Sequence, residues 1–121
     1  MNIFITGIAG FLGSNLAHHL LKKNHKIYGN DNFLGGYEDN LNDEFKFYNI
    51  DCCDYDSMNK ALNNIDVVIH CAATAYEGLS VFSPSFVTKN IFEASVTTFS
   101  AAISNNVKKI IYCSSMARYG S

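Results

Sequence analysis

Three glycines at intervals of three residues follow the first apolar run of the chain, in residues 6–13 (TGIAGFLG). A glycine-rich turn between a strand and a helix lets backbone N–H groups approach a phosphate, and the helix N-terminus adds partial positive charge. Gly7 suits the tight turn, Gly10 the approach to a pyrophosphate, and Gly13 the packing of the helix on the strand. The alternative is a turn that needs glycine only for its own conformation.

An acidic residue follows the second apolar run. Asp31 lies 24 residues after Gly7, where a carboxylate can accept both ribose hydroxyls of an adenosine. Residues 27–45 contain no lysine or arginine that could receive a 2′-phosphate, so the pattern favours NAD over NADP. Two alternatives are a simple turn started by Asp31 and Asn32, and a calcium loop, although the acidic spacing of a calcium loop is absent.

Short apolar runs, typical of strands, alternate along the chain with segments of helical periodicity. These elements must position the glycine loop and Asp31. Helical periodicity occurs in three segments. The first comes after the glycine loop, the second is short and starts at a cap at Asp54 or Ser57, and the third runs for roughly twenty residues from Ser83-Pro84 to Asn105. The alternation predicts an α/β fold with a parallel sheet, right-handed crossovers and helices on both faces. The expected strands are residues 2–6, 26–30, 45–50, 66–71 and 107–113.

Length and composition limit the function classes. The 121 residues suffice for one domain, and a net charge of −2 without long basic runs argues against nucleic acid or an anionic membrane as partner. No apolar run is long enough to span a membrane and the N-terminus has no secretory pattern, so we expect a cytoplasmic protein. The cysteines lack CxxC spacing, so we expect buried free thiols and no metal site; they are Cys52, Cys53, Cys71 and Cys113.

With these motifs together, the chain resembles the extended short-chain dehydrogenase/reductases, the NAD-dependent epimerase/dehydratase family, over essentially its whole length. The Thr-Gly-x-x-Gly-x-x-Gly spacing is that family's form of the loop, and Asp31-Asn32 looks like its ribose-binding pair. Asp51-Cys52 looks like the step after strand three that meets the adenine; the alternative is that Asp51 is a solvent-facing residue at a strand end. The resemblance implies a Rossmann-type fold, a doubly wound parallel sheet with five strands visible in the order 3-2-1-4-5, and NAD as the cofactor.

The end of the predicted fourth strand also resembles that of the family. His70-Cys71-Ala72-Ala73 is similar to the family's ending there, with His70 itself expected to be a packed core residue. Asn90 corresponds to a helix asparagine of the family, or is an ordinary polar helix residue. The cofactor-binding residues that the resemblance implies are Gly7, Gly10, Phe11, Leu12, Gly13, Asp31, Asn32, Asp51, Cys52, Cys71, Ala72, Ala73, Asn90 and Ser114.

Residues 107–120 (VKKIIYCSSMARYG) resemble the family's fifth strand and its serine-bearing end. Counting back from the Tyr-Gly pair places the catalytic serine at Ser115, which would hydrogen-bond the reacting sugar hydroxyl; Ser114 is the weaker choice and a plain serine turn is the alternative. Met116 and Ala117 stand where a dehydratase would carry an acidic pair. Dehydration is therefore disfavoured, and epimerisation or ketone reduction remains.

The family's general base, a tyrosine four residues before a lysine, is absent, because none of the seven tyrosines has lysine at that distance. The resemblance thus implies that residues 1–121 are an incomplete NAD-binding domain, inactive alone, of a nucleotide-sugar epimerase or related oxidoreductase that acts by transient hydride transfer. It also implies a nucleotide-sugar substrate and a homodimer through the helix at 84–105. The alternative is a non-catalytic NAD-binding sensor or structural module.

Overall fold

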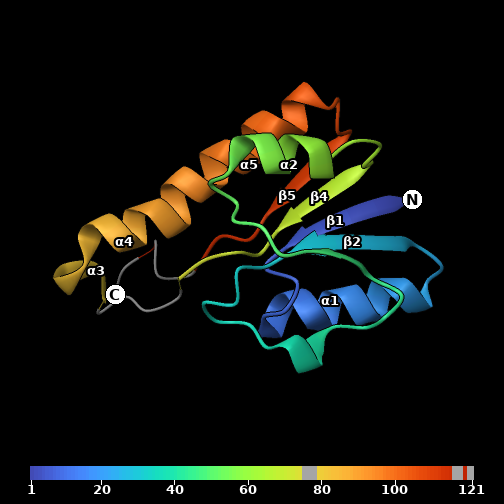
Figure 1. Cartoon of the computed structure of the whole chain (residues 1–121), viewed down its shortest axis with the longest axis horizontal. Helices are drawn as coiled ribbons and strands as arrows, with labels where there is room; N and C mark the ends of the chain where they lie inside the picture. The colour runs from blue at the N-terminus through green and yellow to red at the C-terminus, as the bar shows by residue number, and fades with distance from the viewer. Residues whose placement is uncertain (75–78, 116–118, 120–121) are drawn as a thin grey trace.

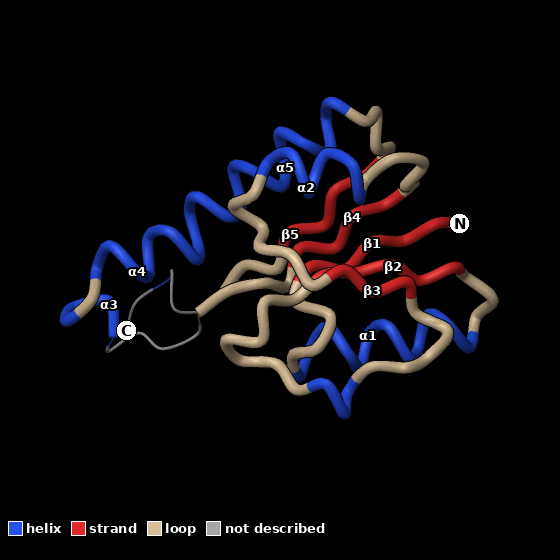
Figure 2. Tube along the Cα trace, viewed as in Figure 1, coloured by secondary structure: helices blue, strands red, loops and turns tan. Residues whose placement is uncertain are grey.

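The computed structural model describes residues 1–74, 79–115 and 119. Its centre is a five-stranded sheet in which every neighbouring pair is parallel, with the order β3-β2-β1-β4-β5 (Figure 2). The predicted α/β fold and strand order are thereby confirmed. The strands are β1 (Asn2–Thr6), β2 (Lys26–Asn30), β3 (Lys46–Tyr48), β4 (Val67–His70) and β5 (Lys109–Tyr112).

Helices cover both faces of the sheet (Figure 1). Helix α1 (Phe11–Lys22) lies on one face, while α2 (Tyr55–Ala61) and α5 (Ala94–Ser104) lie together on the other. Successive strand residues point to opposite faces. Accordingly, Ile3 and Ile5 belong to the apolar cluster beneath α1, and Phe4 belongs to the cluster beneath α2 and α5.

Burial on both faces explains why the strands read as short continuous apolar runs. All four residues of β4 are buried, including His70, which is 2% exposed. A parallel strand with helices above and below has no solvated face, so its sequence lacks polar alternation. The edge strands are less enclosed, and Ile111 and Tyr112 of β5 are 45% and 51% exposed.

The predicted long helix differs from the structure in its regularity. The segment comprises α4 (Pro84–Thr88), a π-helical turn η2 (Lys89–Glu93) and α5, after a short helix α3 (Leu79–Phe82). The Ser95 hydroxyl donates to the Ile91 carbonyl at 2.6 Å, the group that would accept the Ser95 amide in an α-helix. Such competition from a serine side chain loosens a helix and helps to accommodate the wider turn.

Two smaller features complete the chain. Asp54, one of the two predicted caps, caps α2 by accepting the Ser57 amide at 3.2 Å. The polar segment after β2 contains a 3-10 helix, η1 (Glu38–Asn40), that its composition did not predict. Within the described ranges, no helix combines the length and apolar character needed to cross a membrane.

The core on the α2 and α5 face generates a stability prediction. Met58 of α2 is 0% exposed, so Met58→Ala should leave a cavity and lower the free energy of unfolding by about 3 kcal/mol. The matched control is Tyr55→Ala on the same helix, where the side chain is 41% exposed and the loss should stay below about 1 kcal/mol. Urea denaturation of the two variants measures the difference, and equal losses would contradict this packing.

Candidate functional site at the carboxyl ends of the strands

The glycine loop connects β1 to α1 in a conformation that excludes side chains at two positions. Gly7 has φ +68°, and a Cβ there would lie 2.9 Å from the Ala72 backbone. At Gly13 a Cβ would overlap the Gly7 carbonyl oxygen and lie 3.0 Å from the Ile8 Cα. These two glycines are therefore required by the close packing of α1 on the end of β1.

Gly10 is under a different constraint. A Cβ at Gly10 would meet the Gly7 oxygen at 3.3 Å, a tight contact but a milder one than at the other two glycines. Packing within the chain therefore excludes a side chain less strongly at Gly10 than at Gly7 or Gly13. Gly10 is the N-cap of α1, so a side chain added there would project beside the helix N-terminus.

The first amides of α1 are available to a ligand. The first intrahelical bond of the turn runs from the Ser14 amide to the Gly10 carbonyl at 3.0 Å, and no side chain caps the helix. The helix has no acidic residue in its first turn. Phe11 and Leu12, predicted to contact the cofactor, are 87% and 48% exposed at this N-terminus. Amides left unpaired at a helix start carry partial positive charge and attract anions.

Asp31 follows β2 and is only 8% exposed. One carboxylate oxygen accepts the Ala9 amide at 3.0 Å, and the other accepts the Phe33 amide at 2.8 Å. A carboxylate has about four lone-pair positions, so these two bonds leave acceptor capacity for a ligand. Asp31 thereby ties the glycine loop to the end of β2.

The segment after Asp31 folds back over the glycine loop, an arrangement that the sequence did not reveal. Phe33 adopts φ +62°, and the Tyr37 amide and the Asn40 side chain both donate to the Ala9 carbonyl, at 3.0 and 2.8 Å. A Cβ at Gly36 would lie 2.9 Å from an Asp31 carboxylate oxygen. The richness of the segment in Asn and Gly was the only available signal.

The ends of β2 and β3 bring three predicted residues together. The side-chain amide nitrogen of Asn32 lies 3.4 Å from one carboxylate oxygen of Asp51. The other oxygen accepts the backbone amide of Cys53 at 2.8 Å. Cys52 is 5% exposed, and its sulfur lies 3.3 Å from the Asn30 side-chain amide. Burial raises the pKa of the Cys52 thiol, so this sulfur stays protonated and packs as a small apolar group.

Thr6 is a site residue that sequence reasoning missed. Its hydroxyl oxygen accepts the amides of Cys71 and Ala72, at 3.0 and 3.1 Å. Both lone pairs are then used, so the hydroxyl proton must point to Nδ1 of His70, 2.7 Å away. A buried threonine at the end of β1 thus holds the chain segment that follows β4.

The Thr6 contact determines the tautomer of His70. With Nδ1 accepting, the ring proton lies on Nε2 and is donated to the Ser95 hydroxyl at 3.0 Å. Burial lowers the pKa of His70 from its ordinary 6.5 to about 4, so the ring is neutral near pH 7. His70 therefore connects β1 to α5 as a structural core residue, which is the role expected for it.

The remaining predicted residues occupy the β4 and β5 side. Asn90 lies in the π-helical turn, and its side-chain nitrogen is buried without a hydrogen-bond partner. Ala73, Ser114 and Ser115 are exposed after their strands. Met116 and Ala117, the departure from the dehydratase pattern, lie outside the described residues.

The four cysteines are free thiols in the structure, and three of them are less enclosed than expected. Cys52 is buried, whereas Cys53, Cys71 and Cys113 are half-buried. Cys71 and Cys113 directly follow β4 and β5, and Cys53 lies in the loop between β3 and α2. Within the described ranges, no group of three or more His, Cys, Asp or Glu side chains could hold a metal ion.

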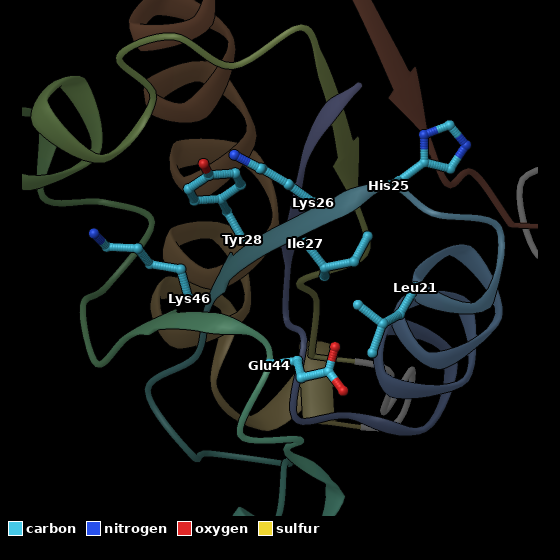
Figure 3. A pocket seen from close by; sticks show the side chains of 7 residues that line it. All are labelled: Leu21, His25, Lys26, Ile27, Tyr28, Glu44 and Lys46. Carbon is cyan, nitrogen blue, oxygen red and sulfur yellow. The ribbon is translucent and has the colours of Figure 1, made fainter.

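Two hollows lie away from the glycine loop and Asp31. One of about 320 Å³ opens at the amino ends of β2 and β3, with Lys26 and Tyr28 on one side of the strand and Ile27 on the other (Figure 3). The other, of about 370 Å³, lies beside β5 on the α1 face and includes Ile69 and Ile111. Neither is lined by a predicted site residue, so we place the site at the glycine loop on its chemistry and geometry.

Comparison with known proteins gives a consistent result. Residues 3–121 match the profile described as the NAD dependent epimerase/dehydratase family. A UDP-glucose 4-epimerase of Halalkalibacterium halodurans is 33% identical over 122 residues, which cover 99% of this chain and 36% of that protein. The first relatives matched are covered to between 32% and 39% of their length, so the chain spans about a third of them.

Solved structures agree with these relatives. A UDP-glucose 4-epimerase from Bifidobacterium longum, in complex with NAD+ and UDP, has a TM-score of 0.92 and 31% identity, covering 99% of this chain and 38% of that one. A UDP-N-acetylglucosamine 4-epimerase from Methanobrevibacter ruminantium, in complex with UDP-N-acetylmuramic acid, has a TM-score of 0.91 and 36% identity. The match covers 98% of this chain and 39% of that one.

The neutral, buried His70 makes stability depend on pH. Between pH 6.5 and about 4 the unfolded chain binds a proton on this residue and the folded chain does not, so the free energy of unfolding falls as pH falls, by about 3 kcal/mol in total. Urea denaturation at pH 7 and pH 4.5 measures the loss. His70→Gln should flatten this part of the profile, whereas His19→Gln on the exposed side of α1 should not; equal slopes in both variants would contradict the assignment.

Proposed function

Because the chain belongs to the NAD dependent epimerase/dehydratase family, we propose that residues 1–121 form an NAD-binding domain with its site at the carboxyl ends of the strands. The observation that carries the proposal is the pairing of two groups at one edge of the sheet. The uncapped N-terminus of α1 offers amides for a diphosphate, and Asp31 beside it offers a carboxylate for a ribose.

Three features support the fit of the cofactor. Gly10 lacks a side chain at the helix N-terminus, although its own neighbours demand this less strongly than those of Gly7 and Gly13. Asp31 retains acceptor capacity after its two amide contacts. Asn90 has a buried amide nitrogen without a partner, and a ligand at this edge would give it one.

The charges near Asp31 favour NAD over NADP. A 2′-phosphate on the adenosine ribose would be repelled by the Asp31 carboxylate, and residues 27–45 supply no lysine or arginine to compensate. Asp51, held beside Asn32 at 3.4 Å, adds a second carboxylate at the ends of β2 and β3. We assign the adenosine half of the cofactor to this side and the remaining half to the side of β4 and β5.

The proposed activity is that of a nucleotide-sugar epimerase or a related oxidoreductase. NAD held at this site would supply the capacity to take up a hydride from a sugar carbon and to return it. Ser115, exposed after β5, would orient the reacting sugar hydroxyl or carbonyl by hydrogen bonding. The relatives support this assignment because they include epimerases of UDP-glucose and UDP-arabinose.

The proton transfer needs a group that residues 1–121 do not contain in the family's form. No tyrosine precedes a lysine by four positions, and a positioned acid or base typically contributes 10²- to 10⁴-fold to rate. We therefore assign cofactor binding and substrate orientation to this chain and expect negligible turnover from residues 1–121 alone.

We also propose that the chain self-associates through residues 84–105. The first part of this segment, α4, projects beyond the sheet, whereas α5 packs on it (Figure 1). The segment also carries large exposed side chains. Phe86, Phe92 and Val96 are 42%, 67% and 48% exposed. Exposed apolar groups gathered on one segment are characteristic of an interface between protein chains.

Asp31→Ala should weaken NAD binding by about 1–3 kcal/mol, roughly 5- to 150-fold, because ribose hydroxyls would lose their acceptor. Isothermal calorimetry measures the change, and Asp39→Ala in η1 is the matched exposed control. Since Asp31 also holds the Ala9 amide, urea denaturation must show that the variant is folded.

Gly10→Val provides an independent test of the same site, because its side chain would project at the helix N-terminus. It should abolish measurable NAD binding in a folded chain. Unchanged NAD affinity in both Asp31→Ala and Gly10→Val would reject the proposed site, and a chain that binds no NAD at all would reject the cofactor.

Phe92→Ser should weaken self-association by roughly tenfold or more, because burying this ring contributes on the order of 2 kcal/mol. Sedimentation equilibrium measures the dissociation constant. Leu34→Ser, at a 61% exposed position in the loop after β2, is the control and should leave self-association unchanged. A monomeric chain, or equal effects of the two substitutions, would contradict the proposed interface.

A further inference from the structure

Two cysteines occupy neighbouring positions just beyond the last paired residues of β4 and β5. His70 pairs with Tyr112 in this parallel ladder, so the next residues along, Cys71 and Cys113, are register neighbours. The Cys113 amide still donates to the His70 carbonyl at 3.3 Å, which keeps the strand ends together. The two sulfur atoms are 3.7 Å apart.

Both side chains point to the same face of the sheet. Cys71 and Cys113 pack against the apolar cluster on the α1 face, the one that contains Ile69 of β4. Both are half-buried, so part of each residue is accessible. The other two cysteines differ, because the Cys52 sulfur contacts Asn30 and the Cys53 thiol donates to the Lys89 carbonyl.

From this juxtaposition we propose that Cys71 and Cys113 are an oxidative modification site that forms an intramolecular disulfide. Neighbouring strands lie about 4.8 Å apart, and the Cα atoms of disulfide-bonded cysteines are usually about 4.4 to 6.8 Å apart. Side-chain rotation can therefore bring the sulfurs from contact to bonding distance. Neither strand end has to leave the sheet.

The reaction requires an oxidant, for which we take a low-molecular-weight disulfide such as oxidised glutathione. The thiolate of one cysteine attacks the S–S bond of the reagent, forms a mixed disulfide and releases one reagent thiolate. The second cysteine then attacks the mixed disulfide and releases the other. The protein loses two protons and two electrons, which the reagent gains as two thiols.

The environment of Cys71 affects how fast this thiol exchanges with a disulfide. Burial, with the adjacent Cys113 sulfur as a smaller cause, raises the pKa of the Cys71 thiol to about 12. Because the thiolate is the nucleophile, Cys71 is a poor first reactant at neutral pH. The attack of Cys71 on a disulfide is therefore expected to become faster as the pH rises toward this value.

A consequence for the cofactor rests on the proposed function, whereas the disulfide itself does not. Cys71 precedes Ala72, whose amide is held by Thr6, and Cys113 precedes Ser114. A bond between the sulfurs would fix the two strand ends that border the proposed site. Bound NAD should in turn slow oxidation by covering this edge.

The experiment incubates the full chain with oxidised glutathione and counts free thiols under denaturing conditions. The four free cysteines should fall to two. Peptide mass spectrometry should find one cross-link, between Cys71 and Cys113, with the loss of two hydrogen masses. Cys71→Ser and Cys113→Ser should each abolish the cross-link, while the control Cys53→Ser should retain it.

Several results would overturn the proposal. These are four free thiols after prolonged incubation, a stable glutathione adduct on Cys113 without a cross-link, or a bond that joins two chains. Repeating the incubation with saturating NAD separates the two proposals. If the cross-link forms at the same rate with and without NAD, the pair is oxidisable but its connection to the cofactor site is wrong.

Discussion

The close approach of α1 to the turn after β1 is the constraint on which the rest of the site depends. At Gly13 there is no room for a side chain against the Gly7 carbonyl, so the first turn of α1 packs directly on the loop that follows β1. This contact directs the free amides of the first helical turn toward the edge of the sheet. Asp31 then holds the loop from the other side through the Ala9 amide. The loop is thus shaped by the chain's own packing before any ligand arrives.

A second connection operates through Thr6 and organises the other border of the site. Its hydroxyl serves two amides that follow β4 and gives its proton to His70, which in turn reaches Ser95 on α5. Each member of this buried chain has its partners, as a polar group in a core requires. Asn90, five residues before Ser95, differs from these residues, because its side-chain nitrogen is buried without a hydrogen-bond partner.

The two halves of the proposed site are enclosed to different degrees. The glycine loop, Asp31 and Cys52 are held by short hydrogen bonds and by both apolar clusters. The β5 side is more open, with Tyr112 half-exposed and Ser115 exposed. This difference matches a division of labour in which one half binds the adenosine and the other receives the reacting groups. The oxidation proposed for the half-buried Cys71 and Cys113 would take place on this more open side.

What the sequence determined by itself was local in nature. The spacing of three glycines, the short apolar runs and the cap at Asp54 each act within a few residues. From them the alternation of strands and helices and the position of Asp31 after the second strand could be predicted, whereas the strand order came with the resemblance to a known family. The tertiary structure decided the contacts between distant segments. The Thr6 contact to His70 joins residues 64 positions apart, the segment from Phe33 to Asn40 covers the glycine loop, and Cys71 meets Cys113 through strand register. Such contacts depend on how strands align and on which lone pairs are already occupied, and neither is encoded in the periodicity of any one segment.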